Sequence, residues 1–439
     1  MDNLPELPRG WIWVNLKDIA EKISDGSHNP PPKQITGVPM LSAQNVENDN
    51  IIFSEFRYIS EDDYNKESAR TIIEPDDVLL TIVGTIGRSA VVKANTPKFS
   101  IQRSVAVIRV KTNPQYLAFV LQSPPIKNFL IKNAKGTAQK GIYLNQLKEV
   151  KVPMAPSPEQ ARIVAKIEQL FSDLDDGIKS LEKAKIELKR YRESVLKAAF
   201  EGKLIDTNIA WVNYNVEDLS EKIQYGLTSK SGEGFKGPKY LRITDIQNRA
   251  VIWENVPYTE ITEDIEKYQL NEGDLVFART GATVGKSFLI KDCPGSAVFA
   301  SYLIRIIPNK KLINPNLLWY YFQTPRYWQF ISKSQRGIGQ PNINGQILAK
   351  LSIKIPRAIE DQISLVQKMD SRFSVLDVAE KTIEKSLTES NRLRQSILKK
   401  AFEGKLTSQD PKDEPVETLL ERIKKERAKL TPQRRRERR

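Results

Sequence analysis

The segment SVLKAAFEGKL, residues 194–204, recurs almost unchanged as SILKKAFEGKL at residues 396–406. Nine of the eleven positions are identical, which chance does not produce in a chain of 439 residues. A long internal repeat decides the architecture before any local pattern does. The chain is therefore a duplicated unit, and each copy ends on this segment.

Outward from this segment, the two copies align at an offset of about 200 residues. Trp11 matches Trp211, Gly26 matches Gly226, and residues 18–23 match residues 218–223 without a gap. The chain is also too long for one ordinary hydrophobic core. We predict five segments: a mixed domain over 1–157, a helix over 158–204, a second mixed domain over 205–357, a second helix over 358–406, and a basic tail over 407–439.

The mixed segments contain short runs rich in β-branched residues, such as 77–83 and 104–110, separated by Gly, Pro and Asn. Such runs predict strands joined by turns. Short helices are expected near residues 114–122 and 315–323. The fold class predicted for each mixed segment is α+β, with strands as a frame and loops as the variable surface.

The helical segments show an apolar residue at every seventh position, which is typical of a coiled coil. Pro158 and Glu159 suit the first turn of a helix, and Gly202 suits its end. The predicted seam consists of Ile167, Leu174, Leu181, Leu188, Val195, Met369, Leu376, Ile383 and Ile397. We expect the two helices to pair as an antiparallel, pseudo-twofold symmetric coiled coil.

A second apolar row on each helix is interrupted by charged residues. Lys185 and Arg192 interrupt it on the first helix, and Glu380 and Arg394 on the second. A buried charge needs a partner of opposite sign. We predict that Lys185 and Glu380 lie in the same or adjacent layers and compensate each other's burial.

Composition bounds the function. Sixty-eight Lys and Arg against 54 Asp and Glu give a net charge of +14, which favours a polyanionic partner such as nucleic acid, with a basic solubilising surface as the alternative. No stretch approaches the ~20 apolar residues of a membrane span, and the N-terminus lacks the pattern of a secretory signal. The single cysteine, Cys293, forms no internal disulfide. A cytoplasmic, non-membrane protein is expected.

Three patterns that suggest enzyme chemistry fail on inspection. Residues 280–287, TGATVGKS, have three residues between their glycines where a phosphate-binding loop needs four, and a strand pattern follows. Residues 29–32, NPPP, carry Pro32 where the related amino-methyltransferase signature has an aromatic residue. With His28 and Cys293 each the only residue of its kind, neither a His/Cys metal cluster nor a histidine-dependent nucleophile is supported. We predict a non-catalytic chain; an unrecognised catalytic core would require methylation or cleavage by the isolated chain.

Taken together, the tryptophan near the start of each half, the helix start PSPEQ at 156–160 and the closing LKxAFEGKL resemble the specificity subunits of type I restriction-modification systems (the HsdS family). The resemblance covers about residues 7–406. The second helix start, AIEDQ at 358–362, departs from the first because it has no proline at the matching position.

The resemblance implies two target-recognition domains that each bind half of a bipartite, asymmetric DNA sequence, with the paired helices as a spacer. It implies double-stranded DNA, two modification (methyltransferase) subunits and restriction (motor-nuclease) subunits as partners. S-adenosylmethionine for adenine methylation, and ATP with Mg²⁺, would belong to those subunits, with no cofactor or metal in this chain. The alternative is a coiled-coil interaction scaffold with only non-specific nucleic-acid binding.

Polar loop residues of the mixed domains are the candidates for DNA contact, because Arg and Lys read guanine, Asn and Gln read adenine, and Asp reads cytosine. In the first half they are Lys33, Gln34, Gln44, Asn45, Arg88, Gln102, Arg103, Gln139 and Lys140. In the second half they are Lys236, Arg242, Thr244, Asp245, Arg279, Lys286, Tyr302, Arg336 and Gln340. The loops differ between halves, SAQN at 42–45 against RITD at 242–245, so the two halves are expected to read different sequences.

Overall fold

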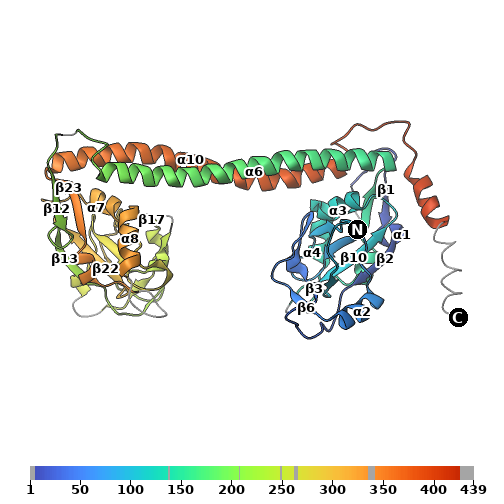
Figure 1. Ribbon diagram of the computed structural model, residues 1–439, viewed down its shortest axis with the longest axis horizontal. Helices are drawn as coiled ribbons and strands as arrows, with labels where there is room; N and C mark the ends of the chain where they lie inside the picture. Colours follow the sequence, from blue (N-terminus) through green and yellow to red (C-terminus); the bar gives the residue numbers. More distant parts are fainter. Residues whose placement is uncertain are drawn as a thin grey trace. The chain divides into compact units, whose positions relative to one another are not determined.

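The computed structural model describes residues 5–136, 139–206, 208–247, 250–261, 265–334 and 342–425. The chain divides into two compact units. Unit 1 comprises residues 1–180 and 386–439, and unit 2 comprises residues 181–385. Each unit contains one mixed domain and about half of each of two long helices (Figure 1).

Unit 1 is built on an antiparallel four-stranded sheet and a smaller three-stranded sheet. The first has the order β2 (Ala20–Asp25), β10 (Val105–Val110), β7 (Val78–Thr81), β8 (Ser89–Val91). The second has the order β6 (Arg57–Ile59), β3 (Val38–Leu41), β9 (Ser100–Ile101), in which β3 and β9 are parallel. Two further antiparallel pairs are β1 (Ile12–Asn15) with β11 (Lys151–Met154), and β4 (Val46–Glu47) with β5 (Asn50–Ile51).

Short helices complete unit 1: α1 (Leu16–Ile19), η1 (Ala43–Asn45), α2 (Glu61–Arg70), α3 (Pro114–Gln122), α4 (Pro124–Asn133) and α5 (Leu144–Lys148). Helix α3 is almost entirely buried, because it shares one core with the four-stranded sheet and with the long helices. Asn113 begins it by accepting a hydrogen bond from the Tyr116 N–H at 3.0 Å. The domain and the long helices of unit 1 are therefore one packed body.

Unit 2 repeats this plan, with one additional strand in its smaller sheet. Its main sheet has the order β13 (Ser220–Tyr225), β22 (Leu303–Pro308), β19 (Leu275–Ala278), β20 (Ser287–Leu289), and the smaller one has β14 (Ser231–Gly232), β18 (Tyr258–Thr259), β15 (Lys239–Leu241), β21 (Ala297–Phe299). The pairs are β12 (Trp211–Asn215) with β23 (Ser352–Pro356), and β16 (Ile246–Gln247) with β17 (Ala250–Val251). The helices are η2 (Ile243–Asp245), η3 (Trp253–Asn255), η4 (Ile265–Tyr268), η5 (Gly281–Thr283), α7 (Pro315–Tyr321), α8 (Pro325–Ser334) and α9 (Gly345–Ala349). The predicted α+β class with two tandem domains and two long helices is confirmed.

The repeated glycine has a steric cause in both units. A Cβ atom on Gly26 would lie 2.1 Å from the Ile101 carbonyl oxygen, and one on Gly226 would lie 2.3 Å from the Ala300 oxygen. In each case the chain leaving β2 or β13 passes directly against the end of the smaller sheet. Only glycine permits that approach, so the position joins the two sheets of each domain.

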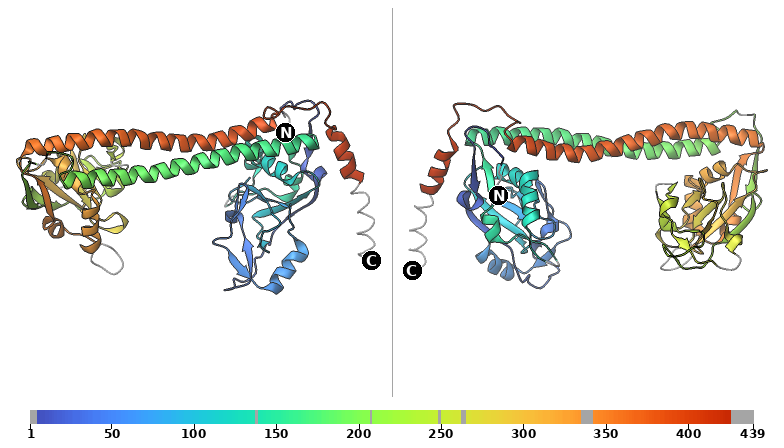
Figure 2. Two further views of the ribbon diagram at one scale, coloured as in Figure 1. Left: turned by 45° about the horizontal axis from the view of Figure 1, so that its top comes forward. Right: turned by 180° about the vertical axis from the view of Figure 1, so that it is seen from behind.

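The long helices are α6 (Ser157–Phe200) and α10 (Ile359–Phe402), and they run antiparallel within each unit (Figures 1 and 2). In unit 1 the start of α6 packs with the end of α10, and in unit 2 the end of α6 packs with the start of α10. Six of the residues assigned to the seam are buried: Ile167, Val195, Met369, Leu376, Ile383 and Ile397. Leu174, Leu181 and Leu188 are half-buried.

In each unit, an arginine, a phenylalanine and an aspartate at equivalent positions of the repeat hold the two helices together. In unit 1 the Arg394 guanidinium lies 4.2 Å from the centre of the Phe171 ring and pairs with Asp175 at 2.5 Å. In unit 2 Arg192 lies 4.9 Å from the centre of the Phe373 ring and pairs with Asp377. The three residues stand at equivalent positions of the repeat. We call this arrangement the interhelical clamp; it combines a cation–π contact with an ion pair.

Lys185 and Glu380 lie close enough for their charges to interact, as the prediction of the same or adjacent layers requires, but the expected compensation of burial is wrong. Lys185 pairs with Glu384 at 2.9 Å, one turn further along α10, and Glu380 lies 4.0 Å from Arg192. The side chains of Lys185 and Glu380 are 44% and 42% exposed, so neither charge needs compensation for burial. The charges that break the apolar row and are largely buried are Arg192 and Arg394 of the clamp.

Each long helix ends in a Schellman motif, which explains the repeated F-E-G-K. The Lys203 N–H donates to the Ala198 carbonyl and the Gly202 N–H to the Ala199 carbonyl; Lys405 and Gly404 repeat the pattern at the end of α10. Gly202 and Gly404 have φ angles of +76° and +68°, the left-handed region. The predicted segments 158–204 and 358–406 therefore include this terminating turn.

A buried glutamine attaches each domain to the start of its long helix. Gln160 donates to the Ala155 carbonyl and accepts from the Asn113 N–H, and Gln362 repeats these contacts with Pro356 and Asn314. Both side chains are almost fully buried. The start of each long helix is thus hydrogen-bonded to the residue that precedes α3 in unit 1 and α7 in unit 2.

Part of the predicted basic tail packs on unit 1. Val416 is fully buried in the core of that unit, and Leu419 and Leu420 pack against it. Asp413 pairs with Arg162 of α6 at 2.5 Å, and Gln409 donates to the Arg9 carbonyl at 2.8 Å. The arginines at the end of the tail lie outside the described residues. Over the parts of the chain that the structure describes, no helix combines the length and the apolarity of a membrane span.

We predict that two glycine-to-alanine changes in α6 have opposite effects. Gly202→Ala should lower the melting temperature, because an alanine in the left-handed region costs about 1–2 kcal/mol. Gly177→Ala should raise it, because Gly177 lies mid-helix with open space around it and alanine gains about 1 kcal/mol there. Thermal unfolding followed by circular dichroism measures both; shifts of the same sign would contradict the account.

Replacing Arg394 should leave the carboxylate of Asp49 without its cationic neighbour. The Asp49 side chain is 24% exposed and lies 3.4 Å from Arg394. Burial raises the pKa of Asp49, so the folded state holds its proton more tightly than the unfolded chain, and ionisation costs stability as the pH rises. Arg394→Gln should therefore destabilise the protein by about 1–3 kcal/mol at neutral pH. The loss should shrink at acidic pH, where Asp49 is protonated.

The matched control is Arg392→Gln, at an exposed position two residues away. It should change stability by no more than about 0.5 kcal/mol at any pH. Equal effects of the two substitutions in unfolding experiments across pH would show that the clamp contributes nothing.

Candidate nucleic-acid interface

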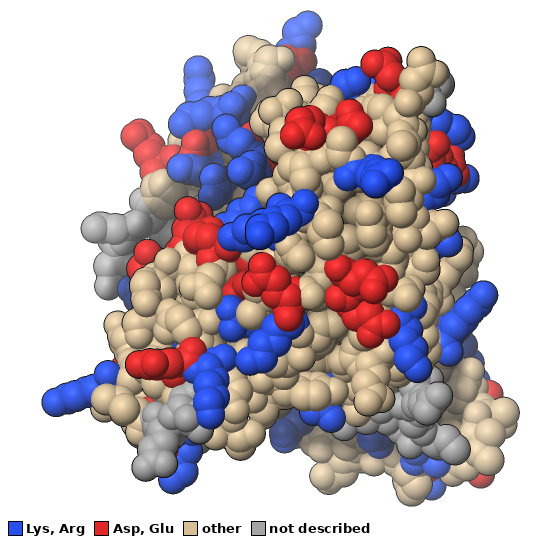
Figure 3. All heavy atoms as spheres, turned by 90° about the vertical axis from the view of Figure 1, so that its left-hand side faces the viewer, with Lys and Arg blue, Asp and Glu red and all other residues tan. Residues whose placement is uncertain are grey.

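On the face drawn in Figure 3, the basic side chains do not form one continuous patch. In the view of Figure 3, Lys and Arg side chains are interspersed with Asp and Glu. Such a mixed surface supplies general solubility and only diffuse attraction for a polyanion.

In unit 1, a polar pocket lies where the parallel strands β3 and β9 end. Leu41 pairs with Ile101, and the Gln102 N–H donates to the Leu41 carbonyl at 2.8 Å. Parallel strands end at the same edge of a sheet, so the residues that follow them emerge side by side. The pocket has a volume of about 250 Å³ and is lined by Lys33, Met40, Ser42, Gln44, Asn45, Glu55, Phe56, Arg57 and Gln102.

Three sequence-derived candidates present polar groups in this pocket. Lys33 and Gln44 are exposed, and Gln102 is half-buried. The Gln44 amide donates to the Glu55 carbonyl at 2.5 Å, which orients it without using its oxygen. Arg57, which the sequence did not single out, donates to the Pro31 carbonyl at 3.2 Å and so supports the proline segment before Lys33.

The side chain of Asn45 is not available to contact DNA. It is 1% exposed, its oxygen accepts from the Ser42 N–H, and its amide donates to the Ile52 and Ser54 carbonyls. All of its hydrogen-bonding capacity is used to shape the loop. The expectation that Asn45 contacts a base is corrected accordingly.

A second basic cluster surrounds the turn between β7 and β8. Arg88 and Lys140 line a pocket of about 350 Å³ together with Lys127 of α4, which the sequence did not single out. The Gly84 N–H donates to the Lys140 carbonyl at 3.3 Å, joining the turn to the segment before α5. The structure thus brings Arg88 and Lys140 together, and separates them from the pocket that holds Gln44.

The remaining candidates of unit 1 are exposed on neighbouring segments. Gln34 is held by its backbone N–H, which donates to the Tyr58 carbonyl at 2.9 Å, and Arg103 by its N–H to the Ser27 carbonyl at 2.9 Å. Their side chains, like that of Gln139, point into solvent to a large extent. His28 pairs with Asp25 at 2.8 Å and is also exposed.

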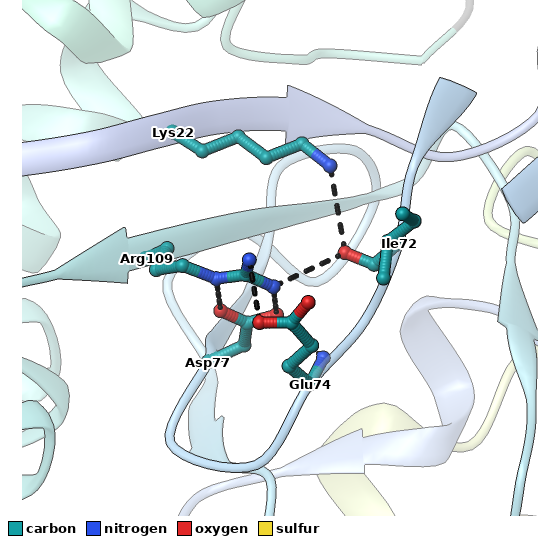
Figure 4. A network of polar contacts seen from close by, with 5 residues as sticks. All are labelled: Lys22, Ile72, Glu74, Asp77 and Arg109. Carbon is teal, nitrogen blue, oxygen red and sulfur yellow. Dashed lines mark hydrogen bonds and ion pairs between the residues drawn. The ribbon is translucent and has the colours of Figure 1, made fainter. Parts of the chain in front are cut away.

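At the start of β7, opposite its turn to β8, Arg109 of β10 connects the main sheet to the segment before β7 (Figure 4). Its guanidinium donates to both carboxylate oxygens of Asp77 at 2.7 Å and pairs with Glu74 at 2.6 Å. The hydrogen bond to Asp77 raises the pKa of Arg109, and Asp77 itself is fully buried. Lys22 and Arg109 both donate to the Ile72 carbonyl, which ties β2 and β10 to the segment before β7.

In unit 2, Arg242 and Asp245 form one group. Arg242 donates to Asp245 from Nε at 3.0 Å and from a terminal nitrogen at 2.8 Å, and the Asp245 hydrogen bond raises the pKa of Arg242. Asp245 also accepts from the Arg242 backbone N–H. Asp245 therefore orients Arg242, and its contact with a base stays a prediction.

Aromatic residues accompany the cations of unit 2. The Arg279 guanidinium lies 4.8 Å from the centre of the Tyr225 ring, and its Nε is buried without an acceptor among the described residues. Tyr302 is 37% exposed, and burial of the rest raises its pKa, so its hydroxyl stays a donor at neutral pH. Tyr225 is a residue that the sequence did not single out.

The other candidates of unit 2 are spread over several loops. Lys236, Thr244 and Lys286 are exposed. Arg336 and Gln340 lie outside the described residues. The structure thus places Arg242 beside Asp245, and leaves Lys236 and Lys286 on separate segments.

The segment that suggested a phosphate-binding loop has a different structure. Residues 281–283 form the short helix η5, and strand β20 begins at Ser287, so no helix follows whose N-terminus would hold a phosphate. Among the described residues, no group of three or more His, Cys, Asp or Glu side chains is placed to hold a metal ion.

The two units share one fold, and each joins a domain with its own polar loops to the pair of long helices. The chain belongs to the family of type I restriction modification DNA specificity domains, whose model matches residues 8–188 and 208–389. Both copies of the repeat are thus members.

Individual relatives cover the same extent. The specificity subunit of the type I restriction enzyme EcoKI, from Escherichia coli K12, is 25% identical over 457 residues. The match covers 96% of this chain and 97% of the relative. The MjaVIII specificity subunit of Methanocaldococcus jannaschii is 23% identical over 404 residues, 85% and 89% of the two chains. Among solved structures, the HsdS subunit of Thermoanaerobacter tengcongensis aligns with a TM-score of 0.55 at 19% identity, over 91% of this chain and 98% of that one.

A chain in the structure described as the basis of complex assembly and conformational transition of the type I R-M system aligns with a TM-score of 0.71 at 17% identity, over 92% of this chain and 100% of that one. At these identities the two solved structures establish the fold alone.

We predict that Gln102 and Asn45 separate recognition from stability. Gln102→Ala should leave the melting temperature nearly unchanged and alter the DNA sequence selected. Asn45→Ala should lower stability by about 1–3 kcal/mol, because the Ser42 N–H and two carbonyls lose their partners. Thermal unfolding and the methylated motif in a host that expresses each variant with its methyltransferase measure the two effects; an unchanged motif with Gln102→Ala would remove it from the candidates.

Proposed function

We propose that this chain is the specificity subunit of a type I restriction-modification complex, and that it chooses the DNA sequence on which partner subunits act. The observation that supports this most is that both copies of the repeat match the DNA specificity family while their loops differ. The chain itself performs no catalysis. S-adenosylmethionine and ATP with Mg²⁺ act on the partner subunits, in the cytoplasm where the DNA lies.

Each unit reads one half of a bipartite, asymmetric site. In unit 1 the pocket at the ends of β3 and β9 offers the amides of Gln44 and Gln102, a chemistry suited to adenine. In unit 2 the corresponding loop offers Arg242, oriented by Asp245, a chemistry suited to guanine. Exposed Lys33, Lys140 and Lys236 serve the phosphates, which position the protein without specifying sequence.

The paired helices α6 and α10 form the spacer between the two half-sites. The interhelical clamp fixes their register in each unit. The outer faces of the helices are left for two methyltransferase subunits, and the restriction subunits join that assembly. Sequence choice is thereby separated from chemistry: the loops of each domain select bases, and the frame sets the distance.

The decisive experiment replaces residues 1–157 with those of a homologue that has a different target. Expressed with its methyltransferase, the hybrid should methylate a motif in which one half has changed and the other half and the spacer have not. Single-molecule sequencing of the host's methylated DNA reports the motif directly. A change in both halves, or in neither, would contradict one domain per half-site.

Footprinting of the unsubstituted complex distinguishes the scaffold alternative. Protection of two short patches separated by an unprotected spacer supports the proposal. Protection that follows no sequence would instead assign the chain to a coiled-coil scaffold that binds nucleic acid without selecting it.

A further inference from the structure

In unit 1, a carboxylate occupies the space between the domain and the helices. The Asp49 Oδ1 accepts from the Gln122 amide at 2.8 Å, and its Oδ2 lies 3.4 Å from Arg394 of α10. Gln122 also donates to the Ser89 carbonyl. Asp49 is thus a built-in anionic ligand for a glutamine of the domain and for the arginine of the clamp.

The equivalent place in unit 2 has the same two donors and no such carboxylate among the described residues. Gln323 corresponds to Gln122, and Arg192 to Arg394. The Gln323 Nε2 is buried and has no acceptor in the described part of unit 2. In the sequence, the residue that matches Asp49 is Arg249, which lies outside the described residues. A donor left without an acceptor away from water is costly, and none of the described residues of unit 2 supplies that acceptor.

Gln323 and Arg192 line an open groove of about 940 Å³ between α6 and the domain of unit 2. Three exposed lysines stand along it: Lys189 of α6, Lys286 of the turn between β19 and β20, and Lys333 of α8. Glu193 is the one acid among the lining residues. The groove is therefore strongly cationic, even though Arg192 is shared with Asp377.

The floor of the groove is aromatic and apolar. Trp319 and Trp328 line it with Phe322 and Leu196, and Trp328 is 38% exposed. Apart from the indole N–H of Trp328, this floor offers flat apolar surface on which a sugar or another ring can stack. A ligand that combines an anion with a ring fits these walls better than a free inorganic ion does.

The geometry points to a phosphate of the DNA backbone, next to the second half-site, as the occupant of this groove, which takes the place that Asp49 fills in unit 1. This inference rests on the proposed function. DNA is favoured over an acidic protein segment because Lys286 belongs both to the groove and to the loops at the ends of the domain strands, so one ligand reaches both. Glutamine, arginine and lysine side chains are the usual phosphate donors.

The domain of unit 2 and helix α6 would then hold the same strand of DNA. Lys189 contributes from the helix, and Lys286 and Lys333 from the domain. Unit 1 makes the corresponding link with its own Asp49, before DNA is present. The second domain thus acquires its final anchorage to the helices only on binding.

The test measures DNA affinity of the complete complex with its methyltransferase at a series of KCl concentrations, by fluorescence anisotropy, on one duplex with the methylated motif and one without it. Lys333→Gln and Lys189→Gln should each reduce the slope of log K against log [KCl] by about 0.9, the amount for one phosphate contact, on both duplexes. Gln323→Leu should weaken binding on both duplexes without changing the slope, because it removes no charge. Lys368→Gln, at an exposed position of α10, is the matched control and should leave the slope unchanged.

Slopes equal to that of the control for both lysine variants would overturn the inference. If these variants instead weakened assembly with the methyltransferase in size-exclusion chromatography, with slopes unchanged, the groove would be a protein-docking surface and the inference would also fall. Failure of the proposed function is a separate result: the unsubstituted complex would then show no preference for the duplex with the motif. Melting temperatures of the variants, all changed at exposed or groove-lining positions, establish that they are folded.

Discussion

The pairing of α6 with α10 is the constraint on which the rest of the structure depends. Each domain alone has a core, but that core is completed by one end of each long helix: Ile163 and Ile397 in unit 1, Val195 and Met369 in unit 2. Between these ends the apolar seam is only half-buried at Leu174, Leu181 and Leu188, so apolar burial alone specifies register weakly there. The interhelical clamp specifies the register more strongly. Its arginine must stack on one ring and reach one carboxylate of the neighbouring helix, and only one alignment of the two helices allows both contacts.

Attachment of the domains to this pair follows from a few repeated contacts. The buried Gln160 and Gln362 connect the helix starts to the domains, and the left-handed glycines end each helix at the turn from which the chain moves on. Within each domain, Gly26 or Gly226 lets the two sheets meet. The loops that differ between the copies hang from strand ends that do not differ, so sequence selection can vary on a frame whose hydrogen bonds stay the same. The described part of the tail packs on unit 1 through Asp413 and Val416.

The sequence predicted the architecture well, because its main signals are periodic. The repeat gave two domains, and the seven-residue spacing gave the long helices and their seam. The contacts of single polar residues were not accessible in this way. Asn45 and Gln44 are adjacent amides in one loop, yet one is consumed by the backbone of its own turn and the other is exposed. Lys185 and Glu380 were paired by their place in a row, but a side chain's reach along an antiparallel neighbour depends on rotamer and stagger, and Glu384 is the nearer carboxylate. Arg57, Lys127 and Tyr225 give no local signal, since only the tertiary fold brings them to the candidate residues.

The interhelical clamp has a consequence for the origin of the chain. Each copy of the repeat carries the complete set of parts: Phe171, Asp175 and Arg192 on α6, and Phe373, Asp377 and Arg394 on α10. The phenylalanine and aspartate of each copy therefore contact the arginine of the other copy, and the reverse also holds. This is the self-complementarity of an isologous interface. Two identical half-length chains could satisfy both clamps by associating with each other.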